Sequence, residues 1–190
     1  MLALIREDRW VHHGRWSEPG FQALAVNRFG TFVFNSNRLV SRLLGPVYYA
    51  LFYAVRTLYG IELPWRTTVG RRVRIAHQNG IVIHDTAVIG DDCAIRHNVT
   101  IGLSGVPGVR RAPALGRGVE IGVGAVIIGP ITIGDNVRIG PNTVVMTSIP
   151  AGATVVASPP RVLTPPNPRR PRKAPAGRPP RGASLVEAED

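Results

Sequence analysis

The chain has 190 residues, a formal net charge of +11 and one cysteine, Cys93. This length suits one compact domain with appendages. A single cysteine excludes an internal disulfide framework, so we expect a small buried thiol and a reducing compartment. The charge suggests a nucleic-acid partner, but the basic residues lack the aromatic interleaving of an RNA-binding sheet and form no recognition helix. No nucleic-acid partner is therefore expected.

Residues 1–63 hold nearly all the aromatic side chains and are expected to be helical. Pro19-Gly20 is a typical helix start, and Gly60 a typical helix stop. Two sets of apolar residues have helical spacing, Phe21, Leu24, Ala25 and Phe29 in the first and Leu39, Leu43, Val47 and Leu51 in the second.

The beginning of the chain has neither the charged lead nor the long apolar run of an export signal, so a cytoplasmic location is expected. The most apolar run, residues 43–55, lies between Arg42 and Arg56. It is shorter than the roughly 20 residues that a membrane span needs. We expect this run to form a helix that packs on its neighbours or on a trimer partner. A helix lying on a membrane surface is the alternative.

A six-residue repeat runs through the middle of the chain. An aliphatic residue recurs every six positions from Leu115 to Val145, and glycine often follows it. A small or β-branched residue occupies the position four residues later. Earlier blocks keep the period, through Val69, Ile75 and Ile81 and then through Ile89, Ile95 and Ile101.

A period of six fits neither an amphipathic helix nor a hairpin strand. It fits short strands and turns wound into a triangular coil, in which three hexapeptides complete one turn and the aliphatic residue fills the interior. Residues 64–163 are therefore expected to form a parallel β-helix, and the chain to be mainly β with a small α-helical segment before the coils. Residues 164–190, rich in proline and arginine, are expected to be a disordered tail.

The repeat is interrupted twice. The spacing slips from six to eight residues between Ile81 and Ile89, and residues 103–114 break the period altogether. Glycine, proline and arginine in the second interruption predict a loop extruded from one corner of the coil. A loop on a rigid scaffold is a common place for function.

These segments resemble the serine acetyltransferases. The resemblance is carried by Ile75-Ala-His-Gln-Asn-Gly, Val99-Thr-Ile-Gly-Leu-Ser-Gly and Ile121-Gly-Val-Gly-Ala, and it covers roughly residues 17–163. It implies a left-handed coil, a trimer with its sites between subunits, and acetyl transfer from acetyl-CoA to a hydroxyl. The short helical region is more similar to family members associated with exopolysaccharide synthesis, including the colanic-acid type.

The resemblance implies that His77 is the general base, because it matches the family's catalytic histidine. A neutral imidazole can take the proton of a hydroxyl as its oxygen attacks the thioester. Two positions depart from the family pattern. Ala76 stands where an aspartate orients the base, and Ala112 stands where a second histidine follows Arg111. Arg111 remains a candidate for an acceptor carboxylate or a CoA phosphate.

His97 lies twenty residues after His77, and each follows an interior isoleucine by two places. We expect the two histidines on the same face, one coil apart, with His97 supporting His77 or acting as the base itself. Asp8 is near the position of a family aspartate that reaches the acceptor. A solvated carboxylate near a helix start is the alternative for Asp8. His12 and His13 are expected at the surface.

The remaining candidates match positions that bind CoA in the family, or carry charges suited to its phosphates. They are Gly102, Ser104, Gly105, Gly124, Ala125, Arg138, Gly140 and Arg161. No metal site is expected, because the histidines are not spaced with cysteine or acidic residues as ligands.

Three functions stay open from the sequence. The first is acetylation of L-serine to O-acetylserine, the second is acetylation of a sugar hydroxyl in a polysaccharide, and the third is a noncatalytic β-helix scaffold. The cysteine-synthase partner of the family recognises a terminal isoleucine. This chain ends in Asp190, so that complex is not expected.

Overall fold

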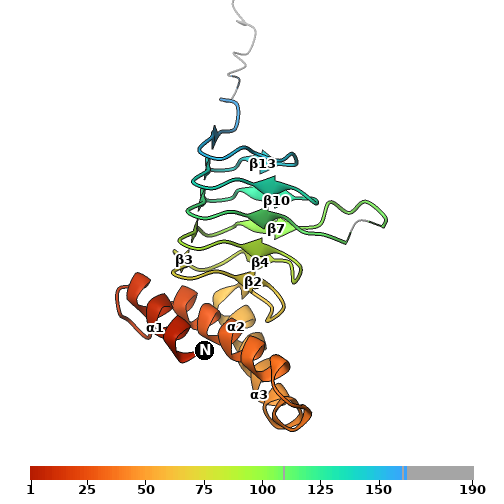
Figure 1. Ribbon diagram of the computed structural model, residues 1–190. Coiled ribbons are helices and arrows are strands. Elements are labelled where there is room, and N and C mark those ends of the chain that lie inside the picture. The colour runs from red at the N-terminus through yellow and green to blue at the C-terminus, as the bar shows by residue number, and fades with distance from the viewer. Residues whose placement is uncertain (109, 160, 162–190) are drawn as a thin grey trace, which may run out of the picture. The chain divides into compact units, whose positions relative to one another are not determined.

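The computed structural model describes residues 1–108, 110–159 and 161. The chain divides into two units, Met1–Ser158 and Pro159–Asp190. The first unit is a stack of short strands with three helices at its N-terminal end (Figure 1). The tail expected to be disordered, residues 164–190, lies outside the described residues.

Three helices precede the coils: α1 (Leu2–Val11), α2 (Pro19–Asn35) and α3 (Arg38–Tyr59). Pro19 occupies the first turn of α2, where its missing N–H costs nothing. Asn37 caps α3 by accepting a hydrogen bond from the Val40 N–H at 2.9 Å, and Gly60 ends it in the left-handed conformation at φ 61°. Both helix signals around Pro19 and Gly60 are confirmed.

The described residues form fourteen short strands, and every pair that they make is parallel. They are β1 (Ile61–Glu62), β2 (Thr68–Val69), β3 (Arg74–Ile75), β4 (Ile81–Ile83), β5 (Val88–Ile89), β6 (Ala94–Ile95), β7 (Thr100–Gly102), β8 (Ala114–Leu115), β9 (Glu120–Ile121), β10 (Val126–Ile128), β11 (Thr132–Ile133), β12 (Arg138–Ile139), β13 (Val144–Val145) and β14 (Thr154–Val155).

From β1 to β10 each strand pairs with the strand three places later along the chain, and β12 pairs with β14, which produces three sheets. Sheet A has the order β1-β4-β7-β10-β13, sheet B the order β11-β8-β5-β2, and sheet C the order β14-β12-β9-β6-β3. The chain therefore visits the three sheets in turn and rises by one strand spacing per circuit. The expectation of a mainly β chain with a small N-terminal helical part is confirmed.

The aliphatic repeat lines the interior of the coil. Ile75, Ile95 and Ile121 occupy one rung each of sheet C and stack directly on one another. The repeat positions from Leu115 to Val145 are all buried, and so are the small or β-branched residues four places after them as far as Thr143. Cys93 fills such a small position, and burial raises the pKa of its thiol to about 11.

Extra residues accumulate at one corner of the coil, between sheets A and B. The interior residues Ile61 and Val69 are eight positions apart, Ile81 and Ile89 also eight, and Ile101 and Leu115 fourteen. The third insertion is the extruded loop, which leaves the stack after β7 (Figure 1). Sheet A begins at Ile61, inside the segment expected to be helical. A two-residue strand directly after a helix carries too little pattern to be recognised.

The helices are fastened to the first coil by contacts that the sequence did not indicate. A Cβ on Gly20 would lie 2.1 Å from the carbonyl oxygen of Ile75, so only glycine fits where α2 meets β3. The expectation that His12 lies at the surface is wrong. Its ring is 3% exposed, its Nδ1 lies 2.6 Å from the Asp8 carbonyl oxygen, and its Nε2 accepts from the Ile75 N–H at 3.1 Å.

Among the residues that the structure describes, no helix is both long and apolar enough to cross a membrane.

Candidate active site

Two histidines face each other at the corner where sheet C turns into sheet A. His77 follows β3 and His97 follows β6, the strand stacked on β3. Their ring centroids are 5.6 Å apart and the rings are nearly perpendicular, at 89°. The expectation that the two residues share a face one coil apart is confirmed.

The backbone holds His77 in an uncommon conformation. Its φ is 71°, in the left-handed region that residues with a Cβ adopt at some energetic cost. His77 is exposed, whereas His97 is partly buried. The Nδ1 atom of His97 is buried and has no hydrogen-bond partner among the described residues. The pair therefore combines one accessible imidazole with one that has a buried ring nitrogen without a partner among the described residues.

The histidines line a cleft of about 430 Å³ between the coil and the start of α2. Glu18, Pro19 and Gly20 form the helix side of this cleft, and Ile75 and Gln78 complete the coil side. Because α2 begins here, the positive end of its dipole lies at the cleft. The site thus offers a base, a positive potential and one carboxylate, that of Glu18.

Sequence reasoning missed Glu18. It lies directly before the helix start and forms a weak exposed contact with Arg15 at 3.7 Å, which gives no sign of function. Only the close packing of Gly20 against Ile75, 55 positions later, brings Glu18 to the histidines. Ala76, beside the base, carries no group that could orient the imidazole. Among the residues that line this cleft, Glu18 is the one with an acidic side chain.

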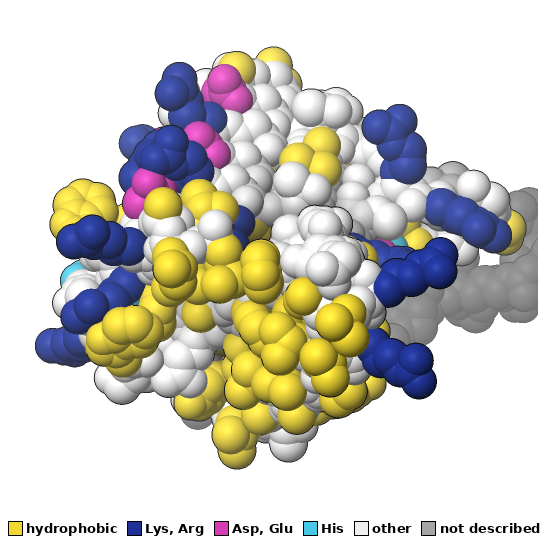
Figure 2. Space-filling view, turned by 60° about the horizontal axis from the view of Figure 1, so that its bottom comes forward, with side chains coloured by type: hydrophobic (Ala, Val, Ile, Leu, Met, Phe, Trp, Pro, Cys, Tyr) yellow, Lys and Arg dark blue, Asp and Glu magenta, His cyan; other side chains and the backbone are white. Residues whose placement is uncertain are grey.

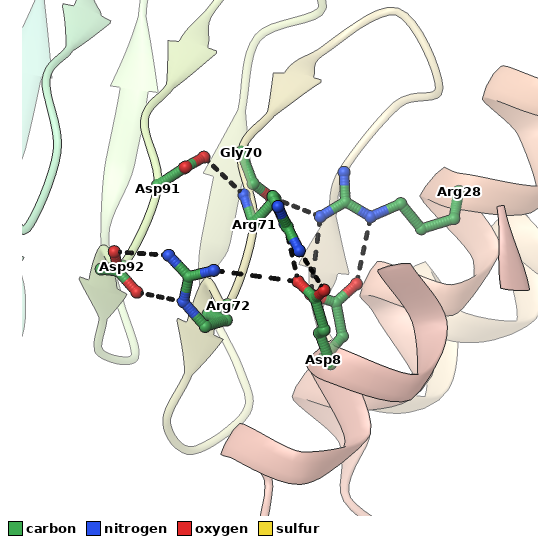
Figure 3. Close-up of polar contacts among 8 residues, drawn as sticks. Asp8, Arg28, Gly70, Arg71, Arg72, Asp91 and Asp92 are labelled. Carbon is green, nitrogen blue, oxygen red and sulfur yellow. Dashed lines mark hydrogen bonds and ion pairs between the residues drawn. The ribbon is translucent and has the colours of Figure 1, made fainter. Parts of the chain in front are cut away.

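Asp8 does not have the solvated environment that was one expectation for it. Its carboxylate is fully buried, and the Arg28 Nε donates to it at 3.0 Å (Figure 3). Arg28 also donates to the backbone carbonyls of Val69 and Gly70. Burial raises the pKa of the Asp8 carboxyl, against the opposing effect of the Arg28 guanidinium. Asp8 is therefore committed to joining α1, α2 and β2, and the interpretation of it as an acceptor contact is corrected.

Glu7, on the same helix, is part of a neighbouring exposed network. It accepts hydrogen bonds from Arg71. In the same network Arg72 pairs with Asp92 at 2.6 Å (Figure 3). The Arg71 guanidinium lowers the pKa of the Glu7 carboxyl, and Arg72 does the same for Asp92. These charges fasten α1 to the first two coils rather than line the cleft.

Arg111 lies at a different corner. It is exposed on the extruded loop between sheets A and B, and it is absent from the lining of the histidine cleft. The neighbouring Ala112 is 8% exposed, and its N–H donates to the Thr86 Oγ1 at 3.2 Å. A histidine at position 112 would therefore not point freely from this loop. Within one chain, Arg111 and His77 do not meet.

The residues expected to bind CoA also divide between two corners. Gly102, Ser104 and Gly105 lie at the loop corner, whereas Gly124 lies in the same column as the histidines and donates its N–H to the His97 carbonyl at 3.1 Å. Ala125 is fully buried, and its N–H and carbonyl are both paired within the coil, so the expectation that it contacts CoA is not supported within one chain. Gly140 and Arg138 line a shallow cavity of about 650 Å³ on sheet C. Arg161 belongs to the C-terminal unit and stays a prediction.

The coil matches a known family model. Residues 113–146 match the bacterial transferase hexapeptide family, described as six repeats. A serine acetyltransferase of Mycobacterium tuberculosis is 44% identical over 146 residues, which cover 76% of this chain and 61% of that protein. A serine acetyltransferase of Helicobacter pylori is 38% identical over 146 residues, which cover 77% of this chain and 82% of that protein. The chain belongs to the serine acetyltransferase family.

Solved structures of the serine acetyltransferase family have a similar fold. The Brucella abortus enzyme in complex with coenzyme A matches with a TM-score of 0.71 and 26% identity, over 84% of this chain and 66% of that one. The Neisseria gonorrhoeae enzyme in complex with serine matches with a TM-score of 0.69 and 29% identity, over 83% of this chain and 67% of that one. The chain spans 61% and 57% of the length of the Mycobacterium and Synechococcus elongatus relatives.

Proposed function

We propose that this chain is an acetyl-CoA-dependent O-acetyltransferase that acts on L-serine. The single observation that carries the proposal is the histidine pair, placed in a cleft of a chain that is 38–44% identical to serine acetyltransferases. Structures of relatives in complex with coenzyme A and with serine support the donor and the acceptor.

His77 is the proposed general base. Its accessible imidazole takes the proton of the serine hydroxyl while the hydroxyl oxygen attacks the thioester carbonyl of acetyl-CoA. The new C–O ester bond replaces the C–S bond, and the departing CoA thiolate receives the proton from the imidazolium. No acyl-enzyme is needed, because both substrates are held in the same site. His97 supports the ring of His77 from the next coil, and its role as the base is the alternative.

Glu18 is the proposed contact for the ammonium group of serine. It is the carboxylate that the cleft offers beside the two histidines, and a charged pair with an ammonium fits its position at the cleft edge. The start of α2 favours negative charge nearby, which suits the serine carboxylate or the developing oxyanion.

The assembly is proposed to be a homotrimer with a left-handed coil, as the family resemblance implies. The division of the candidates between two corners supports shared sites, since Arg111 on one chain then faces His77 of the next. In this arrangement residues 64–163 form the acyltransferase domain, with Gly102, Ser104 and Gly105 of the loop and Gly124 and Gly140 of the coil beside the pantetheine. Arg138 and Arg161 are proposed for the CoA phosphates.

The decisive assay follows thiol release from acetyl-CoA with L-serine and with a panel of sugars, and identifies the product by mass spectrometry. We expect release with L-serine and formation of O-acetylserine. A sugar hydroxyl is the second candidate acceptor, because Ala76 and Ala112 replace two residues of the serine-type site. Thiol release with a sugar and not with serine would show that the chain is a sugar O-acetyltransferase. Thiol release with neither acceptor would favour a noncatalytic scaffold.

A further inference from the structure

An apolar stripe on α3 lies open to solvent. Leu39, Leu43, Val47 and Leu51 follow one another at four-residue spacing, and the first two are 66% and 65% exposed. Residues at this spacing share one helix face, and twelve positions correspond to about 18 Å of helix. The sequence pattern predicted this face correctly. The expectation that residues 43–55 form a helix packed on its neighbours is confirmed, because Tyr48 and Val55 of α3 are buried, but the stripe itself stays exposed within one chain.

The stripe is part of a larger apolar surface at the helical end of the first unit. Figure 2 shows hydrophobic side chains gathered into a continuous patch there, with basic side chains at its edges. An apolar groove of about 460 Å³ between α2 and α3 extends the stripe, and Leu51, Leu58 and Trp16 line it. Two partly exposed tyrosines, Tyr49 and Tyr53, lie on the same helix. A surface of this kind marks a site of interaction.

The charges around the stripe have one sign. The segment 19–59, which contains α2 and α3, has four arginines and neither aspartate nor glutamate. Arg28 is buried against Asp8, and Arg56 pairs with Glu62 at 3.1 Å. Arg38 and Arg42, beside Leu39 and Leu43, form no ion pair with any described residue. The apolar stripe is therefore bordered by uncompensated positive charge.

We propose that the helical end binds the surface of an anionic lipid bilayer, with α3 lying in the interface. Leu39, Leu43 and their stripe enter the boundary between headgroups and acyl chains, and Arg38 and Arg42 contact lipid phosphates. Tryptophan and tyrosine are the side chains that favour this depth. A twofold contact with a second copy is a poorer fit for the same face, because it would set the uncompensated arginines of two copies against each other.

The test is flotation of the purified full-length protein with vesicles. One set contains phosphatidylcholine alone, and the other equal parts of phosphatidylcholine and phosphatidylglycerol. We expect binding to the anionic vesicles that is at least about tenfold stronger than to the neutral ones and weakens with salt. Brominated lipid is expected to quench tryptophan fluorescence, which reports insertion of the helical end without any substitution.

Two double variants separate the apolar and the charged contributions. Leu39→Ser with Leu43→Ser is expected to lower binding about tenfold or more, and Arg38→Gln with Arg42→Gln to lower it on anionic vesicles only. The matched controls are Val156→Ser and Arg117→Gln, which change an exposed valine and an exposed arginine on the coil and are expected to leave binding unchanged. All six substituted positions are exposed, so circular dichroism should report the same fold.

Two results would overturn the proposal. The first is equal binding by the wild type and both double variants, which would place the lipid contact elsewhere, for example on the basic tail. The second is absence of vesicle binding together with a concentration-dependent assembly that Leu39→Ser with Leu43→Ser abolishes. That outcome would assign the stripe to a second copy of the chain.

Discussion

Arg28 makes several of the polar contacts that join the helices to the coil. It donates to the Asp8 carboxylate and to two carbonyls of the first coil, Val69 and Gly70. Asp8 is fully buried, so its charge is tolerated only because Arg28 neutralises it. The sequence could not reveal this pairing, because an acidic residue at position 8 on an amphipathic helix also suits a solvated or a substrate-binding role.

Asp8→Ala is expected to destabilise the fold by about 3–5 kcal/mol, because it leaves the Arg28 charge buried without a partner. Urea unfolding, followed by circular dichroism at one protein concentration, measures the change. Asp92→Ala is the matched control, since its ion pair with Arg72 is exposed and should contribute little. Equal stability of Asp8→Ala and wild type would show that the pair does not hold α1 in place.

Glu18→Gln tests a residue that the structure places in the cleft and that the sequence did not indicate. If Glu18 holds the serine ammonium, the variant should raise the KM for serine about tenfold or more while the KM for acetyl-CoA stays unchanged. Glu62→Gln, which removes a carboxylate outside the histidine cleft, is the control. An unchanged KM for serine would exclude Glu18 from acceptor binding.

At the scale of elements, the coil was predictable and the junction between helices and coil was not. The aliphatic period of six specifies which side chains face inward, because every coil imposes the same choice at Ile75, Ile95 and Ile121. The contacts of His12 with Ile75 join residues 63 positions apart. No local pattern records such a pairing, which is why His12 was expected at the surface.

Gly20 is expected to be indispensable at that junction. In Gly20→Ala the new Cβ would lie 2.1 Å from the Ile75 carbonyl oxygen, and backbone on both sides cannot yield without moving α2. We expect a loss of about 1–3 kcal/mol and reduced acetyl transfer, because the helix side of the cleft moves with α2.

Gly45→Ala is the control for Gly20→Ala. Its Cβ would have only ordinary contacts, the nearest at 3.7 Å from Phe34, and alanine favours a helix. Thermal melting should show this variant as stable as the wild type or more so. If Gly20→Ala also melts at the wild-type temperature, the close approach of α2 and β3 is not required.

At the scale of the whole molecule, the candidate site residues do not all meet within one chain. His77 and Arg111 were both predicted from the sequence, yet they occupy different corners of the coil. The period identifies the corner of each residue but carries no information about which corner of another copy lies opposite. In the proposed trimer, His77 of one chain lies near Arg111 of the next. Complementation between two inactive variants tests this arrangement.

Mixed assemblies of His77→Ala and Arg111→Ala chains are expected to regain activity. If each site takes its base from one chain and its arginine from the next, some sites in a mixed trimer contain both wild-type residues. Co-expression with two different affinity tags isolates the mixed species, and thiol release from acetyl-CoA measures it. Activity no higher than that of either parent variant would contradict a site shared between chains.

The most direct measurement of the central claim is the turnover number for L-serine in His77→Ala, compared with His97→Ala and wild type. The account predicts that His77→Ala lowers kcat by about 10²–10⁴-fold, because the exposed imidazole of His77 takes the hydroxyl proton, while His97→Ala loses less because His97 only supports that ring. Full acetyl transfer by His77→Ala would contradict the account.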